Sequence, residues 1–98
     1  MADDGSHRLK DWTVTISVDE TGGQTRAKAK LRWRDQEAVG VGLSRLAPHD
    51  RYKAQIGDEL AVARALSDLA RRMMAGAVQH IEAEEHRANR RLELSTRE

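Results

Sequence analysis

The sequence predicts an α+β subunit of the order β-β-β-α, in which a three-stranded antiparallel meander precedes one long C-terminal helix. Three runs within residues 12–46 alternate apolar with polar side chains, as half-buried strands do, and short turn signals separate them. Residues 58–85 instead repeat apolar side chains every three or four positions, which is typical of an amphipathic helix. The short turns place the second strand at the centre of the sheet.

The length and composition limit the classes of protein to consider. The 98 residues suffice for one core, so we expect a single domain over residues 11–87, a flexible N-terminus over residues 1–10 and a charged tail over residues 88–98. The chain contains no Cys, which excludes disulfides, thiolate metal sites and cysteine nucleophiles. It shows neither the layout of a signal peptide nor an apolar run that could cross a bilayer, so we expect a soluble, cytoplasmic protein.

The first expected strand covers residues 12–18. Its apolar face consists of Trp12, Val14, Ile16 and Val18, and hydroxyl side chains occupy the other face. Gly22 and Gly23 follow this strand, and they predict a hairpin because turns between paired strands need positive φ.

The second strand, residues 26–34, alternates basic and apolar side chains without exception. Its core-facing positions are Ala27, Ala29, Leu31 and Trp33. Its outward positions, about 6.7 Å apart, are Arg26, Lys28, Lys30, Arg32 and Arg34. Like charges along one strand repel each other, and a surface that served only solubility would mix the signs. We therefore predict that these five side chains bind RNA phosphates; a merely solvated face is the alternative.

Residues 38–46 are the third expected strand, after a tight connection at residues 35–37. We expect its larger apolar side chains to face the core: Val39, Val41 and Leu43. The outward positions would then be Gly40, Gly42 and Ser44, which are small enough for a phosphate backbone to reach the basic side chains.

A connector over residues 47–55, which contains Pro48, leads to a helix that begins near Ile56, with acidic residues in its first turn. Its predicted apolar stripe is Val62, Leu66, Leu69, Met73, Ala77 and Ile81. We expect the helix to end near Glu85 and the charged segment from residue 88 to be frayed. The side chains expected in the core or in a subunit interface are Trp12, Trp33, Leu66, Leu69 and Met73.

The dimensions of these elements predict a homodimer. Three strands make a sheet about 15 Å wide, whereas one helix covers about 10–12 Å. The helix would also be about 42 Å long, compared with about 34 Å for a ten-residue strand. A second helix from a twin subunit would cover the remaining sheet, and the connector is long enough for the subunits to be intertwined by exchange of helices.

Two sequence patterns could suggest a metal site or a phosphate-binding loop, but we predict neither. The acidic and histidine side chains that could gather around a metal are His80, Glu82, Glu84, Glu85 and His86. They lie on one helix, and no second element supplies a further ligand. Gly40-Val41-Gly42 precedes no helix, so it is no phosphate-binding loop. With so small a core we predict no catalytic residue, no metal, no cofactor and no small-molecule substrate. A small-molecule binder at the dimer interface is the weakest alternative.

The motifs together resemble a family of small actinobacterial proteins of unknown function associated with dormancy. The resemblance rests on WTV at residues 12–14, TRAKA at 25–29, LRWR at 31–34, VGVGL at 39–43, IGDEL at 56–60 and ARALSDL at 63–69. It further includes Arg45, Leu46, Pro48 and Asp50, and IEA at residues 81–83 with His86. It implies an intertwined β-β-β-α dimer of the double-stranded-RNA-binding type and a likeness in fold to ribosome hibernation factors. No catalytic residue is implied.

We therefore expect a non-catalytic, dimeric stress or dormancy protein that binds RNA or the ribosome through the basic face of its sheet. It would act by occupancy, without bond chemistry. The alternative is a regulatory dimer with an acidic protein partner and no role in binding nucleic acid. Charge reversal on the basic strand distinguishes the two functions.

Overall fold

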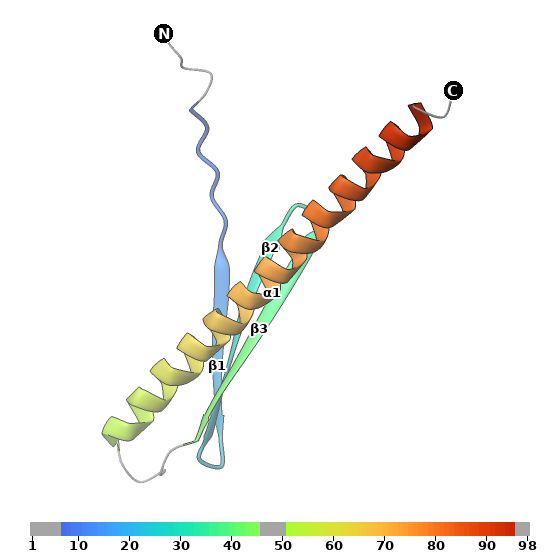
Figure 1. Cartoon of the computed structure of the whole chain (residues 1–98). Coiled ribbons are helices and arrows are strands. Elements are labelled where there is room, and N and C mark those ends of the chain that lie inside the picture. The colour runs from blue at the N-terminus through green and yellow to red at the C-terminus, as the bar shows by residue number, and fades with distance from the viewer. Residues whose placement is uncertain (1–6, 46–50, 96–98) are drawn as a thin grey trace.

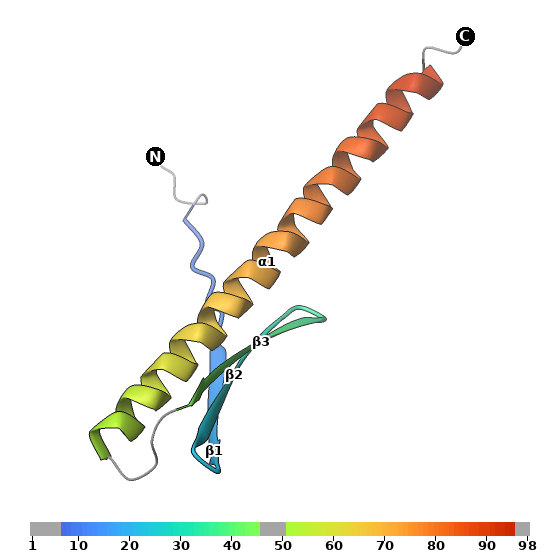
Figure 2. The ribbon, with the colours of Figure 1, turned by 60° about the horizontal axis from the view of Figure 1, so that its bottom comes forward.

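The computed structural model describes residues 7–45 and 51–95 (Figure 1). It contains strands β1 (Val14–Thr21), β2 (Gln24–Trp33) and β3 (Gln36–Arg45), followed by helix α1 (Arg51–Ser95). The strands form one antiparallel sheet in the order β1-β2-β3, and α1 lies across one face of it, as both ribbon views show (Figures 1 and 2). The predicted α+β order of β-β-β-α is confirmed.

Two-residue turns join the strands. Gly22 and Gly23, with φ of 59° and 77°, connect the paired residues Thr21 and Gln24, which confirms the predicted hairpin. Trp33 pairs with Gln36 across the second turn, so Arg34 lies in this turn and not in the strand. Arg34 has a φ of 55°, which is a conformation that glycine adopts far more readily than arginine.

Helix α1 packs most closely on β3, because both elements present small residues there. A Cβ atom on Gly40 would overlap the carbonyl oxygen of Ala65 and the amide nitrogen of Leu69. A Cβ atom on Gly42 would overlap the backbone of α1 at Ala61 and Ala65. The absence of side chains at the two glycines therefore brings the backbones of α1 and β3 together.

This contact corrects the predicted faces of β3. Gly40, Gly42 and Ser44 are buried beneath α1, whereas the exposed side of β3 carries Val39, Val41 and Leu43. The prediction that the larger apolar side chains face the core was wrong. The close approach of the helix backbone leaves no room for them on that side.

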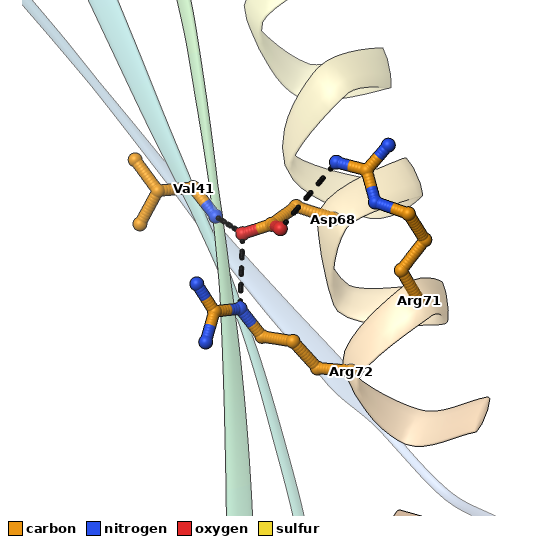
Figure 3. A network of polar contacts seen from close by, with 4 residues as sticks. All are labelled: Val41, Asp68, Arg71 and Arg72. Carbon is orange, nitrogen blue, oxygen red and sulfur yellow. Dashed lines mark hydrogen bonds and ion pairs between the residues drawn. The ribbon is translucent and has the colours of Figure 1, made fainter. Parts of the chain in front are cut away.

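Side chains of α1 also bond to the backbone of β3 (Figure 3). The Val41 N–H donates to Asp68 Oδ2 at 2.9 Å, and Arg64 Nη1 donates to the Leu43 carbonyl at 2.6 Å. At the end of the strand, Ser44 Oγ donates to the Gly57 carbonyl at 2.7 Å. The first two bonds satisfy backbone groups on the free edge of β3, which would otherwise be exposed to pairing with another chain.

Asp68 is itself held by two arginines on α1. Arg72 Nε lies 3.1 Å from Oδ2 and Arg71 Nη2 lies 3.5 Å from Oδ1 (Figure 3). The Val41 hydrogen bond, and then these guanidinium groups, hold the pKa of Asp68 below its usual value of 3.8. The ionised carboxylate therefore stabilises the fold above pH 3.8, and this contribution is lost as the pH falls through the lower folded-state pKa.

The buried core is small and built largely from alanine. Its members are Ala27, Ala29, Leu31, Ala61, Ala65 and Leu69. Among the side chains predicted for the core or interface, Leu69 is buried, Trp33 and Met73 are half-buried, and Trp12 and Leu66 are 51% and 40% exposed. Trp12 and Leu66 lie outside this core because α1 covers β2 and β3 but not β1.

Helix α1 is longer than predicted at both ends. It begins at Arg51, within the expected connector, whereas Pro48 lies outside the described residues. It continues to Ser95, so residues 88–95 are helical, which corrects the expectation of a frayed segment. The segment lacks Gly and Pro and is rich in Arg, Leu and Glu, which are good helix formers.

Within the described part of the chain, no helix combines the length and the apolar character that crossing a membrane requires.

We predict that Gly40→Ala lowers the free energy of unfolding by about 1–3 kcal/mol, the usual cost of overpacking, because its Cβ would displace the backbone of α1. Gly76→Ala is the matched control. No atom lies within 4 Å of its added Cβ, so this helical substitution should stabilise the protein by about 0.8–1 kcal/mol. Urea denaturation measures both values, and equal stabilities for the two variants would contradict the proposed contact.

Candidate nucleic-acid interface

Four basic side chains of β2 project from the sheet face that α1 leaves open: Arg26, Lys28, Lys30 and Arg32. We call them the basic row. They alternate with buried Thr25, Ala27, Ala29 and Leu31, which lie on the helix side of the same strand. Both ribbon views show the helix against only one side of the sheet (Figures 1 and 2). The basic row therefore lies on the central strand of the sheet, and the opposite face of this strand is buried in the core.

The two neighbouring strands give the basic row unlike flanks. On β1, the outward residues paired with Lys30, Lys28 and Arg26 are Thr15, Ser17 and Asp19. On β3, the residues paired with Arg32, Lys30, Lys28 and Arg26 are Glu37, Val39, Val41 and Leu43. The prediction of small residues on both sides was thus wrong for β3, where an aliphatic flank replaces the expected glycines.

Glu37 is the acidic side chain that contacts the basic row. Its Oε2 accepts a hydrogen bond from Arg32 Nε at 3.0 Å and lies 3.6 Å from Lys30 Nζ. The hydrogen bond from Arg32, and then the charge of Lys30, lower the pKa of Glu37 below 4.5. Glu37 is therefore ionised at neutral pH and offsets part of the positive charge at this end. Within residues 7–45 and 51–95, Arg26 and Lys28 form no ion pair.

A shallow hollow of about 350 Å³ lies on the same face beside the β1–β2 turn. It is lined by Asp19, Thr21, Gln24, Arg26, Val41 and Leu43. Because it offers a carboxylate acceptor, a hydroxyl and an amide as well as one guanidinium, it suits a group that both donates and accepts hydrogen bonds.

The fifth predicted side chain, Arg34, does not extend the basic row. It lies in the β2–β3 turn and lines a second cleft, together with Trp12 and Trp33. These two indoles stack with ring centroids 5.3 Å apart and an angle of 18° between their planes. Sequence reasoning missed this cleft, although the hairpin register contains a signal for it. Gly22 and Gly23 form a two-residue turn, and extending its pairing places Trp12 opposite Trp33.

The open face thus combines the basic row with the aliphatic flank of β3 and the polar hollow. Neither described tryptophan lies on it, so bases cannot stack there as they do on RNA-recognition sheets. The helical acidic and histidine side chains, including His80 and His86, show no grouping of three or more potential metal ligands in the described residues. The positive charges of the basic row attract anionic groups in general.

Comparison with known proteins reveals close relatives. The family model described as Rv2632c-like matches residues 10–90. The uncharacterised protein Mb1767 of Mycobacterium bovis is 58% identical over 90 residues, which cover 92% of this chain and 96% of that protein. The uncharacterised protein Rv2632c of Mycobacterium tuberculosis is 49% identical over 83 residues, 85% of this chain and 89% of that protein. The crystal structure of Rv2632c matches with a TM-score of 0.75 and 50% identity, covering 82% of this chain and 95% of that chain.

We predict that Glu37→Gln strengthens the binding of duplex RNA about two- to fivefold at low salt, because it removes the carboxylate that offsets Arg32 and Lys30. Glu20→Gln makes the same change of charge on β1, at a position paired with buried Thr25 on the helix side, and should leave the affinity nearly unchanged. Fluorescence anisotropy with labelled RNA compares the variants. A similar gain from both would show that only net charge matters.

Proposed function

This chain belongs to the Rv2632c-like family, and we propose that it is a non-catalytic RNA-binding protein that holds a phosphate backbone against the outer face of its sheet. The basic row is the observation that supports this proposal best. Its four cations occupy successive outward positions of the central strand, and their alternate neighbours are buried. A line of cations at the regular spacing of a strand fits a polymer of negative charges better than a single small anion.

The contacts would be made to phosphates and not to bases. Lys and Arg side chains about 6.7 Å apart can each reach a phosphate oxygen, and these contacts position nucleic acid without reading its sequence. Four such contacts would give a slope of log affinity against log salt of up to about −0.9 × 4 on a B-form duplex, and less on single strands. We therefore expect strong salt dependence and weak sequence preference.

The hollow beside Arg26 favours RNA over DNA. A ribose 2′-hydroxyl both donates and accepts hydrogen bonds. Asp19 supplies an acceptor there, and Thr21 and Gln24 supply groups of both kinds. A bare phosphate would instead be repelled by the Asp19 carboxylate. The sugar would thus occupy the hollow, while the phosphates on either side lie over the basic row.

The resemblance to dormancy-associated proteins and hibernation factors suggests the target. In this proposal the protein acts in the cytoplasm during stress, binds a surface of ribosomal RNA and blocks it or bridges two particles. The chemistry is occupancy alone. The resemblance supplies the ribosome and the stress condition, whereas the basic row supplies the contact with RNA.

A second candidate is a regulatory protein that binds an acidic protein partner. The aliphatic flank favours it. Val39, Val41 and Leu43 lie beside the basic row, and an RNA backbone has no apolar groups to pack against them. A partner with apolar side chains among acidic ones would contact both flank and row. RNA binding at low salt separates the candidates.

We further propose that two copies of the chain associate through the surface around β1. Val14, Ile16 and Val18 lie on the helix side of the sheet yet remain 38–45% exposed, since α1 does not cover them. Helix α1 bears a second exposed apolar stripe: Ile56, Leu60, Met74, Val78 and Ile81. It is also about 68 Å long, roughly twice the length of a ten-residue strand. Each copy thus has an exposed apolar stripe on its helix and an uncovered apolar row on its sheet. In a dimer, the helix stripe of one subunit could cover the sheet of the other.

We predict that replacing Lys28, Lys30 and Arg32 together by Glu abolishes RNA and ribosome association while the protein stays folded, because all three project from the open face. Co-sedimentation with ribosomes and anisotropy with duplex RNA measure the loss. The control replaces Arg87, Arg90 and Arg91 by Glu on the distal part of α1, with an equal change of charge and little expected effect. Survival of RNA binding in the β2 variant would place the site elsewhere, and no binding by the wild type at low salt would favour the acidic partner.

We predict that Ile16→Glu converts the dimer to a monomer, because it places a charge in the uncovered apolar row of β1. Thr15→Glu, the neighbouring position on the opposite face, should leave the dimer intact. Analytical ultracentrifugation at micromolar concentration distinguishes the two states. A monomeric wild type at that concentration would rule out this mode of association.

A further inference from the structure

A cleft of about 700 Å³ opens between α1 and the end of the sheet where β2 turns into β3. Its volume is in the range of small-molecule sites. Trp12 and Trp33 line it from the strand side, Arg72, Met73 and His80 from α1, and Arg34 from the turn. Its two tryptophans lie on the helix side of the sheet, whereas Glu37 and Val39, which also line it, flank the basic row. The cleft thus borders the basic row without containing any of its four cations.

The cleft contains a flat aromatic surface. Trp12 and Trp33 are the only tryptophans of the chain, and they stack on each other within it. Trp12 remains 51% exposed, although burying an indole is among the larger stabilising contributions available to a core this small. A planar ring placed against the exposed indole would continue the stack and remove that apolar surface from water.

Arg34 occupies its position in the turn against its backbone preference. Its φ of 55° favours glycine, and the other two-residue turn of this sheet has glycine at both of its positions. A strained residue beside a cleft points to a use for its side chain. Arg34 forms no ion pair within residues 7–45 and 51–95, so its guanidinium is available to an anion.

The other charged groups of the cleft are already paired. Arg72 is held by Asp68, and Glu37 is held by Arg32 and Lys30. Among the arginine and glutamate side chains of the cleft, this leaves Arg34 without a partner among the described residues. It lies next to His80 and to an apolar lining that includes Met73 and Ala77. This combination matches a ligand with an aromatic body and one anionic group.

We propose that the cleft binds a planar aromatic anion of about mononucleotide size, with its ring stacked on the tryptophan pair and its anionic group bound by Arg34. The site does not depend on RNA binding by the basic row. Its ligand would contact α1 and the β2–β3 turn simultaneously, and would therefore hold the end of the sheet against the helix.

The two indole N–H signals in a ¹H–¹⁵N NMR spectrum report on this cleft directly, because the chain has no other tryptophan. Titration with AMP and, separately, with 2-naphthoate should shift both signals saturably for at least one of the two probes. Adenosine lacks the anion and ribose 5-phosphate lacks the ring, so each should bind at least tenfold more weakly than AMP. Absence of saturable shifts with both AMP and 2-naphthoate at millimolar concentration would overturn the proposal.

Arg34→Gly tests the role of the guanidinium. It should weaken probe binding at least tenfold and raise the thermal unfolding midpoint, because glycine tolerates this φ. Lys28→Glu, on the opposite face, should leave probe binding unchanged. Unaltered binding by Arg34→Gly would refute the assignment. So would indole signals that move on dilution of the protein and not with either probe, since the cleft would then be an interface between subunits.

Discussion

The close contact between the backbones of α1 and β3 determines which surfaces of this domain are buried and which stay open. Gly40 and Gly42 allow the helix to approach the strand, and Ala61 and Ala65 are the small residues that meet them. Asp68 and Arg64 then bond to the free edge of β3. With the helix docked at one edge of the sheet, the basic row faces solvent on one side and the apolar row of β1 stays uncovered on the other.

This asymmetric docking explains why one small chain presents two unlike surfaces. The outer face is cationic with an aliphatic flank, and the phosphate contacts proposed for it would rest on long-range attraction. The helix side is apolar along β1 and ends in the tryptophan cleft. A core built mostly from alanine cannot stabilise the domain strongly by burial alone. Binding of a second copy or of a ligand to the uncovered apolar surface would therefore stabilise the folded state further.

Much of this arrangement can be predicted from sequence, because local rules act undisturbed in the first two strands. The alternation over residues 26–34 predicts both faces of β2, and Gly22-Gly23 predicts the first turn and its register. Assigning the faces of a strand by hydrophobicity fails at β3, where Val and Leu would ordinarily face the core and Gly would face outward. There the helix approaches so closely that only glycine fits, a tertiary effect that periodicity does not contain. The true length of α1 was missed because residues 88–95 lack an apolar stripe but still have high helix propensity.

The position of Arg34 was predicted wrongly, because alternation alone does not show where a strand ends and a turn begins.

We propose that docking of α1 leaves the basic row free to hold RNA, and an NMR perturbation map with a short RNA duplex at low salt would test this. We expect shifts of the signals of Ser17, Lys28 and Lys30 on the outer face, whereas those of Ala61 and Ala65 beneath the helix should not move. Shifts confined to α1, with the outer face of the sheet unaffected, would contradict it.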